Sequence, residues 1–404
     1  MNNLILNGKK WIIAVSSGPD SMALFQYCIN NNIDVICAHV NYGKRDAAVN
    51  EEKSISDFCN LHSIKLETLH PYKDEDGNFQ DWARRIRYSF FKDCLKKYDA
   101  FGILVAHHQD DVIETYLMQK KRGSIPDYYG IKEVSVINGC SIYRPLLSFS
   151  KLDCINYCKK YQTKYFIDES NLGDDYERNR VRHNIVEKLS KNSRDEILKE
   201  IELRNIELSN KRERLSSFLD DRLPLDDYFK LGKDDRLFAL RLWLDYHQQS
   251  EAKASLKHLA SIDEMLTSNR NFVIQLKDKQ LFKQKEFCEI VGNEDKVYEF
   301  VLQSYQQLNT AYFQICDHGP INCGIKVVDD DYPLTIRCFR AGDRIKGKFH
   351  TKKISRLFIE KKIELSKRRL WPVVLNRKGE VILVPGICCS REYYSVKSNF
   401  FVIK

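Results

Sequence analysis

The first 190 residues of the chain alternate short apolar runs with stretches in which apolar residues recur every three or four positions. A short apolar run is typical of a buried strand, and the three-to-four spacing is typical of an amphipathic helix. The pattern predicts strands at 11–15, 34–40, 65–70 and 101–107, and helices at 21–31, 47–62, 81–97, 111–121 and 150–161. Strands that alternate with helices favour an α/β fold with a parallel sheet.

The rest of the chain carries a different pattern. Residues 184–221 are highly charged, with isoleucine and leucine at helical spacing, which predicts one long amphipathic helix that connects two domains. Helical spacing continues over 228–270, strand-like alternation covers 272–291, and beyond 327 short β-branched runs surround a helix at 355–362 and end in strands at 381–384 and 399–403. We therefore expect an N-terminal domain at 1–190, a connecting helix at 191–221, a mainly helical middle domain at 222–326 and a small α+β domain at 327–404.

Composition indicates a folded protein without a membrane segment. Of the 404 residues, 43% are apolar and 11% are aromatic, which is enough for a packed core in each domain. The N-terminus lacks the basic-then-apolar order of a signal peptide, and no apolar run approaches the ~18 residues that span a bilayer, so we expect a cytoplasmic protein. The thirteen cysteines are odd in number and lack CxxC spacing, so we expect reduced core residues rather than disulfides, zinc or an iron–sulfur cluster.

Positive charge is concentrated near the C-terminus. The net charge is +9, and between residues 337 and 369 thirteen lysines and arginines outnumber three acidic residues, which gives +10 there and about −1 elsewhere. A local basic stripe is typical of a protein that binds a polyanion, although a solvated lysine-rich surface has the same composition. The aromatic residues among these cations could stack on RNA bases or pack in a core, and we favour the core for Phe358; they are Phe339, Phe349, Phe358 and Trp371.

The sequence VSSGPDS, residues 15–21, joins the first predicted strand to the first predicted helix. In a parallel sheet such a turn lies where the free amides of a helix N-terminus bind anions. Its serine hydroxyls, the close approach that Gly18 allows and the helix-compatible Pro19 suit a phosphate chain. Asp20 would repel phosphates unless a divalent cation lay between them, which argues for Mg²⁺. A capped strand-to-helix turn that binds nothing is the alternative.

The same heptapeptide resembles the SGGxDS motif of the PP-loop ATP pyrophosphatases, with Ser17 at the first glycine of the motif. Further motifs follow in order: HVNYGKR (39–45), ARRIRYSFF (83–91), AHHQDDVIET (106–115), KRGS (121–124), RPLLSFSK (144–151) and DESNLGDDYERNRVRHNI (168–185). Together with residues 337–363 and 368–387, they resemble the tRNA(Ile)-lysidine synthetase family over nearly the whole chain. Asn41 and Tyr42 depart from the aspartate and histidine of that family.

This resemblance implies a ligase whose N-terminal domain has the PP-loop, adenine nucleotide alpha hydrolase-like fold. The family attaches lysine to C2 of the wobble cytidine in the CAU anticodon of isoleucine tRNA. ATP adenylates the cytosine O2 with release of pyrophosphate, and the lysine amine then displaces AMP. The implied cofactors and partners are ATP, Mg²⁺, L-lysine and tRNA(Ile), and the oligomeric state stays open, a homodimer included.

The resemblance also implies roles for individual residues. Those implied to bind ATP are Ser16, Ser17, Gly18, Pro19, Asp20, Ser21, His39 and Arg84. The implied catalytic residues are Asp20, Arg87 and Asp111, of which Asp20 and Asp111 would also hold the metal. Those implied to bind tRNA are Arg122, Arg178, Arg180, Arg182, Arg344, Lys352 and Lys353.

Taken without the family, the acidic and histidine residues of this set have structural explanations. Asp111 at a helix start, with Glu114 three residues on, would form a capping box. His107 and His108 are expected to be partly buried histidines whose hydrogen bonds are satisfied.

The arginines have both kinds of explanation. Arg84 and Arg87 share a helix face and either reach triphosphate oxygens or line a solvated surface. The three arginines at 178–182 suit RNA phosphates or a stacked base better than an intramolecular ion pair.

Two other functions compete with lysine ligation. A sulfur-inserting PP-loop thiolase of tRNA would share the nucleotide loop, but such enzymes generally carry cysteine pairs, and CxxC spacing is missing here. A non-catalytic tRNA-binding protein could keep a degenerate nucleotide domain, and only Ser17 supports that alternative.

Overall fold

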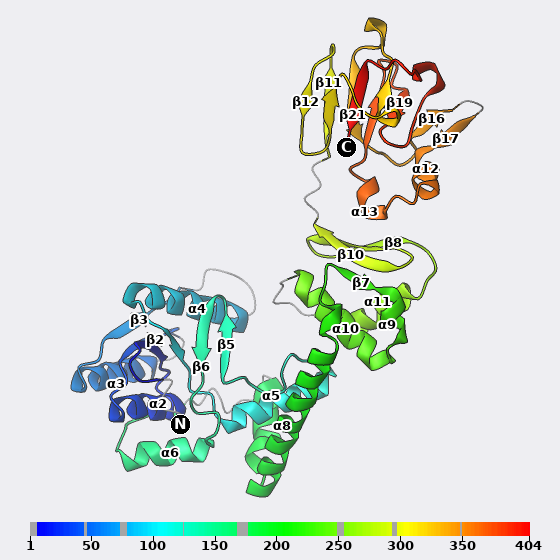
Figure 1. Ribbon diagram of the computed structural model, residues 1–404. Helices are drawn as coiled ribbons and strands as arrows, with labels where there is room; N and C mark the ends of the chain where they lie inside the picture. The colour runs from blue at the N-terminus through cyan, green and yellow to red at the C-terminus, as the bar shows by residue number, and fades with distance from the viewer. Residues whose placement is uncertain are drawn as a thin grey trace. The chain divides into compact units, whose positions relative to one another are not determined.

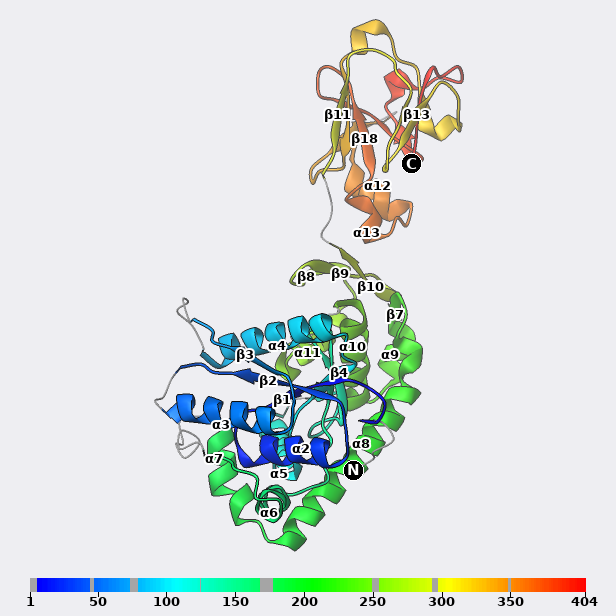
Figure 2. The ribbon, with the colours of Figure 1, turned by 90° about the vertical axis from the view of Figure 1, so that its left-hand side faces the viewer.

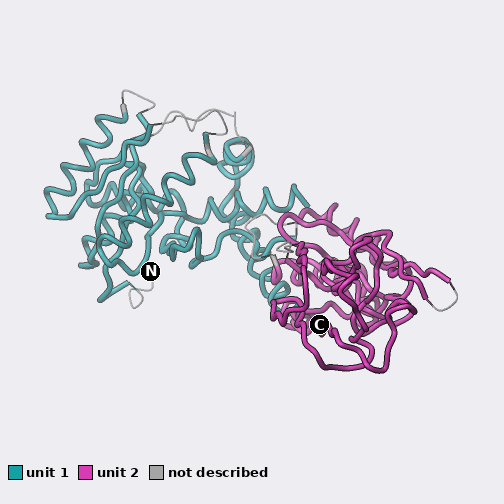
Figure 3. Tube along the Cα trace, turned by 90° about the horizontal axis from the view of Figure 1, so that it is seen from above, with its two compact units in different colours: residues 1–211 teal, residues 212–404 magenta. Residues whose placement is uncertain are grey.

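The computed structural model describes residues 6–43, 47–72, 79–123, 125–167, 177–248, 254–292, 297–347 and 350–404. The chain forms two compact units, Met1–Lys211 and Arg212–Lys404 (Figure 3). The candidate site lies in the first unit.

Unit 1 is built on a six-stranded sheet with strand order β3-β2-β1-β4-β6-β5 (Figure 1). The first five strands in this order run parallel, and only the edge strand β5 pairs antiparallel, with β6. The strands are β1 (Trp11–Ala14), β2 (Val35–Val40), β3 (Leu66–Leu69), β4 (Gly102–Leu104), β5 (Val134–Ile137) and β6 (Cys140–Tyr143). The parallel α/β fold expected from the periodicity is confirmed.

Helices cover both faces of this sheet (Figures 1 and 2). Because successive strand residues point to opposite faces, Trp11 and Ile13 pack on one side with α2, α3 and α6, whereas Ile12 packs on the other side with α4. The helices of the unit are α2 (Pro19–Asn30), α3 (Ala47–Leu61), α4 (Phe79–Tyr98), α5 (Gln109–Arg122), α6 (Lys151–Lys160), α7 (Glu177–Asn184) and α8 (Lys191–Arg214). Because helices cover both faces, the central strands β1 and β4 are apolar and buried along nearly their whole length.

In this part of the chain the sequence analysis missed one element and was wrong about another. The β5–β6 hairpin was not predicted. The segment 184–221 is not one helix, because a 3-10 turn (Val186–Lys188) separates α7 from α8 and a second (Ser216–Phe218) follows α8. Leucines and isoleucines at helical spacing fit either arrangement, so the periodicity could not show these breaks.

Unit 2 begins with helices α9 (Leu225–Lys230), α10 (Lys233–Gln248) and α11 (Leu256–Leu266) and an antiparallel sheet of order β7-β10-β9-β8. The strands are β7 (Arg222–Pro224), β8 (Phe272–Gln275), β9 (Lys279–Lys283) and β10 (Phe287–Gly292). Residues 222–292 thus contain both helices and a four-stranded sheet, whereas we expected a mainly helical domain.

The last part of unit 2 contains a seven-stranded and a four-stranded sheet. The first is formed by β11 (Glu299–Leu302), β15 (Leu334–Cys338), β16 (Arg344–Lys346), β17 (Thr351–Lys353), β18 (Pro372–Leu375), β19 (Val381–Val384) and β20 (Cys388–Cys389). The second is formed by β12 (Leu308–Asn309), β13 (Gln314–Cys316), β14 (Gly324–Ile325) and β21 (Phe400–Ile403). Helices α12 (Ile354–Glu360) and α13 (Leu365–Arg368) complete it.

Strand pairing corrects the expected boundary at residue 327. Because β11 pairs with β15 and β13 pairs with β21, residues from 299 onward belong to the C-terminal sheets. These pairs join segments that are far apart in sequence, which local patterns do not reveal.

All thirteen cysteines are free, and the eleven buried ones confirm that most are core residues, whereas Cys388 and Cys389 are half-buried. Among the described residues, we find no helix with the length and apolar character that a membrane crossing requires.

Candidate active site

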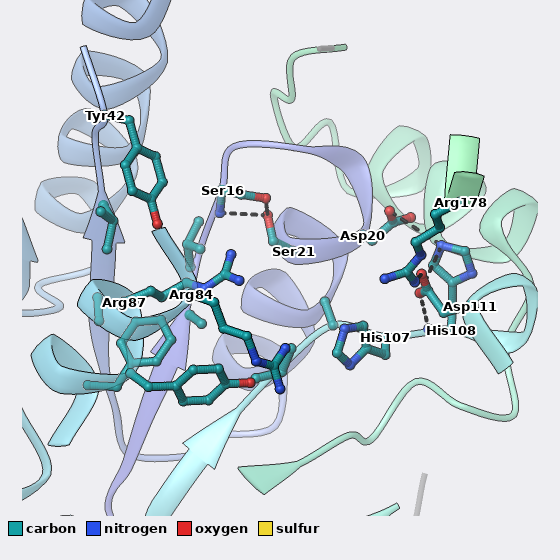
Figure 4. Close-up of a pocket in the computed structure, with 18 of the residues that line it drawn as sticks. Ser16, Asp20, Ser21, Tyr42, Arg84, Arg87, His107, His108, Asp111 and Arg178 are labelled. Atoms are coloured by element: carbon teal, nitrogen blue, oxygen red, sulfur yellow. Dashed lines mark hydrogen bonds and ion pairs between the residues drawn. The ribbon is translucent and has the colours of Figure 1, made fainter. Parts of the chain in front are cut away.

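A cavity of about 390 Å³ opens at the carboxyl ends of β1, β2 and β4. Adjacent strands of a parallel sheet bring the loops that follow them to one edge, which is where α/β proteins bind ligands. Figure 4 shows Ser16 and Ser21 of the VSSGPDS loop between two groups of side chains: Tyr42, Arg84 and Arg87 on one side, and Asp20, His108, Asp111 and Arg178 on the other.

The loop holds an unusual backbone conformation. Ser17 has φ of 59°, in the left-handed region that glycine favours, and its side chain is 3% exposed. Its hydroxyl donates to the Ser16 carbonyl oxygen at 2.6 Å, and its carbonyl oxygen accepts from the Phe166 amide at 2.9 Å. Gly18 then caps α2, with Pro19 in the first turn. The glycine of the PP-loop motif thus matches a backbone requirement that this chain meets with serine.

Ser21 closes the loop from the helix side. Its hydroxyl donates to the Gly18 carbonyl oxygen at 3.0 Å and accepts from the Ser16 amide at 3.2 Å. The loop is therefore preorganised by its own hydrogen bonds, with the Ser16 and Ser21 side chains at the cavity.

One carboxylate oxygen of Asp20 contacts His108, and the other has no hydrogen-bond partner among the described residues. Its Oδ2 lies 3.5 Å from His108 Nε2, whereas Oδ1 is buried and has no hydrogen-bond partner among the described residues. A buried carboxylate oxygen without a donor is unfavourable unless a cation or water satisfies it. Asp20 therefore fits a Mg²⁺ ligand.

Asp111 belongs to a different capping box from the one expected. The capping box of α5 consists of His108 and Asp111, not Asp111 and Glu114: His108 accepts from the Asp110 amide, and Asp111 Oδ2 accepts from the His108 amide at 2.9 Å. Asp111 Oδ1 accepts from Arg178 at 2.5 Å. Because both oxygens have donors, the structure gives no support to Asp111 as a metal ligand. The helix begins at Gln109, two residues before the predicted start at 111.

Charge at this side of the cavity shifts two pKa values. Burial lowers the pKa of His108, but the Asp20 hydrogen bond and the Asp111 charge outweigh it, so the pKa is raised. Burial alone would raise the pKa of Asp111. The positive charges of His108 and Arg178 have the larger effect and lower this pKa, so Asp111 is ionised near neutral pH.

Arginines of α7 pair with carboxylates of α5, which corrects the expectation that they make no intramolecular ion pair. Glu114 is fully buried, and its two oxygens accept from Arg178 Nε at 2.9 Å and Arg182 Nε at 2.5 Å. These partners lie more than sixty positions away, so inspection of nearby sequence missed them. Arg180 is exposed, and tRNA binding by the three arginines stays a prediction.

Of the remaining residues assigned to ATP, Arg84 lines the cavity, together with the catalytic candidate Arg87, but His39 does not. His39 is buried, with Nδ1 2.9 Å from the Val15 carbonyl oxygen, so it supports the start of the loop from β2. Tyr42, which replaces the histidine of the resembled family, lines the cavity and donates its hydroxyl to the Ala83 carbonyl oxygen at 3.1 Å.

Sequence reasoning assigned no role to Arg144 and no site role to His107. His107 lines the cavity, and its Nδ1 accepts from Arg144 Nε at 3.0 Å. Burial lowers the pKa of His107 to about 4. Arg144 opens the motif RPLLSFSK, which carried no chemical signal by itself.

The basic stripe of unit 2 divides into paired and exposed cations. Arg337 is buried and pairs with Asp343 at 2.8 Å, whereas Arg344 and Lys353 are exposed and face each other across β16 and β17. Lys352 pairs with the buried Ile345 on the other face of the two strands, is half-buried and lies 3.5 Å from Glu360. Arg122, at the exposed end of α5, belongs to unit 1.

The three aromatic residues of the stripe that the structure describes pack against one another. Phe358 is fully buried, as expected, and contacts Phe339 and Trp371 with ring centroids 5.0 and 5.6 Å apart. Phe349 lies outside the described residues.

Comparisons with known proteins agree with this arrangement. Residues 1–189 match the family model of a PP-loop domain, and residues 334–399 match that of a TilS substrate C-terminal domain. The chain is 30% identical to the tRNA(Ile)-lysidine synthase of Mycoplasma mycoides, over 94% of this chain and 97% of that protein. It is 29% identical to that of Bacillus subtilis, over 96% and 91%, and 44% identical to that of Ureaplasma parvum, over 45% and 56%.

Proposed function

Because this chain belongs to the tRNA(Ile)-lysidine synthase family, we propose that it ligates L-lysine to C2 of the wobble cytidine in the CAU anticodon of isoleucine tRNA. It is an enzyme that uses ATP. The observation that carries the proposal is one cavity bordered by Ser16, Asp20 and Ser21 of the SSGPDS loop, by two arginines of α4 and by Asp111, whereas Ser17, Gly18 and Pro19 do not line it.

The chemistry explains why a nucleotide is required. The cytosine C2 oxygen is a very poor leaving group, so it is first activated by attack on the α-phosphorus of ATP, which releases pyrophosphate. The lysine amine then displaces AMP from C2. The Ser16 hydroxyl and the free amides at the start of α2 would bind phosphate oxygens, and Arg84 and Arg87 would balance their charge.

Mg²⁺ would be held by Asp20, whose Oδ1 is without a partner among the described residues. When bound, the ion supplies positive charge that offsets the negative charge of the phosphates. Asp111 is ionised and its pKa is lowered, which makes it a weak proton acceptor. We therefore assign it attraction of the lysine ammonium group rather than general-base catalysis.

RNA binding would involve surfaces of both units. In unit 2, Arg344, Lys352 and Lys353 would bind tRNA phosphates without reading sequence. In unit 1, Arg122, Arg178, Arg180 and Arg182 would contact the RNA, with Arg178 and Arg182 oriented by Glu114.

One reaction tests the proposal. The purified protein is incubated with ATP, Mg²⁺, labelled lysine and an isoleucine tRNA transcript with a CAU anticodon, and the nucleosides and nucleotides are analysed. Lysidine and AMP are expected in equal amounts. A transcript with uridine at the wobble position and a methionine tRNA transcript with the CAU anticodon are the matched controls, and neither should accept lysine. If AMP and lysidine fail to form with the first transcript, the proposal is wrong.

A further inference from the structure

Arg144 is a buried cation whose described partners are all neutral. It is 5% exposed, and its guanidinium donates to His107 Nδ1 at 3.0 Å, to the Lys132 carbonyl oxygen at 2.8 Å and to the Ser135 hydroxyl at 2.9 Å. Among the described residues, no carboxylate forms an ion pair with it. A buried charge without a counter-ion is costly to fold, so its retention calls for a compensating role.

The hydrogen bond from Arg144 fixes the tautomer of His107. A guanidinium has donors only, so His107 Nδ1 must present its lone pair, and the proton of the neutral ring is on Nε2. Arg144 itself does not line the cavity, whereas His107 does. In Figure 4 the His107 ring lies between Arg84 on one side and His108 and Asp111 on the other. A neutral imidazole with its proton on Nε2 thus borders the cavity, and a cation is hydrogen-bonded to its other ring nitrogen.

The adjacent histidines His107 and His108 have different electrostatic surroundings. His108 lies against Asp20 and Asp111, which raise its pKa, whereas burial and the charge of Arg144 keep His107 neutral. A neutral donor polarised by a cation favours an anionic oxygen. The cavity is also lined by Arg84 and Arg87, whose positive charges favour the same class of ligand.

We propose that His107 donates its Nε2–H to a phosphate oxygen of the bound ATP, and that Arg144 is the positioning residue that holds His107 in the required tautomer. The inference rests on the proposed function for the identity of the nucleotide. The negative charge of the triphosphate would then compensate the buried positive charge of Arg144.

Variants of His107 distinguish the contribution of its N–H donor from that of the imidazole ring. His107→Ala removes the donor and is expected to weaken ATP affinity, measured by calorimetry without RNA, or to lower kcat for AMP formation by about tenfold, the loss expected for one charge-assisted hydrogen bond. His107→Gln places an amide N–H near the position of Nε2 and should recover most of the loss. His258→Gln, at an exposed histidine of α11, is the matched control and should match the wild type. If His107→Ala binds and turns over ATP as well as the wild type, the proposal is wrong.

Nitrogen NMR and a double-mutant cycle test Arg144. Imidazole ¹⁵N shifts, with the His107 signals identified by their loss in His107→Gln, should show the Nε2–H form in the wild type and a tautomer mixture in Arg144→Met. The Arg144→Met and His107→Ala losses should not add, because one acts through the other. An Nδ1–H signal in the wild type, or additive losses, would overturn the assignment. Arg144→Lys, which keeps the charge but not the Nε donor, serves if the methionine variant does not fold.

These measurements remain informative if lysidine does not form. ATP affinity and the tautomer are read without RNA, so they decide the role of His107, whereas the transcript assay decides the proposed function.

Discussion

Ser17 shows how one backbone angle can restrict a position more than side-chain chemistry does. Its left-handed φ suits glycine, and the serine offsets part of the strain through the hydrogen bond from its hydroxyl to the Ser16 carbonyl oxygen. The loop sequence alone predicted a phosphate-binding turn, but it could not show which residue adopts this conformation.

Replacing Ser17 with two small residues should separate these effects. Both variants lose the hydroxyl, but Ser17→Ala keeps a Cβ in the left-handed region, so it should be less stable than Ser17→Gly by about 1 kcal/mol. Urea unfolding measures the difference. Equal stability of the two variants would mean that the loop relaxes to another conformation.

Asp20→Asn should abolish lysine transfer while tRNA affinity stays within a few-fold, because an amide replaces the unpartnered carboxylate that would hold Mg²⁺. Lysidine formation and tRNA binding are measured on the same preparation. Asp57→Asn, at an exposed aspartate of α3, is the control and should leave both unchanged. Normal turnover of Asp20→Asn would refute the metal assignment.

His107 should make the protein sensitive to acid. Its pKa is about 4 in the folded protein and near 6.5 in the unfolded chain, so between these pH values the unfolded state binds more protons and stability falls as pH decreases. The full contribution is about 3 kcal/mol. His107→Gln should lose less stability than the wild type between pH 6.5 and 4 in urea titrations. Parallel pH profiles would show that His107 is protonated in the folded state.

At the scale of elements, sequence periodicity predicted the first four strands and five helices within a few residues, because each has a strong apolar pattern of its own. The β5–β6 hairpin was missed, since its strands are short and Val134 and Val136 are exposed. A usable signal was present: Asn138 and Gly139 both have positive φ, and Asn-Gly between apolar residues is the strongest short-range sign of a hairpin.

The same limit applies to the site. Loop residues and Arg84 could be predicted from their motifs, whereas the partners of Arg178 and the role of Arg144 depend on contacts between distant segments. Such contacts are set by the packing of α5, α7 and the hairpin, which a linear pattern does not encode.

Glu114→Gln should destabilise unit 1 by about 3 kcal/mol, because it removes one of the two buried carboxylates that pair with Arg178 and Arg182 and leaves only Asp111. Denaturant unfolding measures the loss. Glu202→Gln, at an exposed residue of α8, should change stability by less than about 0.5 kcal/mol. If the two substitutions have equal effects, the α5–α7 ion pairs contribute nothing.

At the scale of the whole molecule, the charge distribution gives the clearest expectation. Neutralising Arg344, Lys352 and Lys353 together should weaken tRNA binding and flatten its dependence on salt, since each phosphate contact adds about 0.9 to the slope. Neutralising Arg340, Lys346 and Lys367, each paired with a carboxylate at 2.6 Å, is the matched control and should change the slope less. An unchanged slope in the first variant would mean that these cations only solvate the surface.

The free cysteines give the protein an internal reporter of local opening. Burial raises the pKa of Cys28, Cys140 and Cys288, so alkylating reagents should modify these thiols only in molecules that have opened. Seven buried thiols belong to unit 1 and four to unit 2. Mass spectrometry after timed alkylation would therefore show whether the two units open together or independently, without any engineered label.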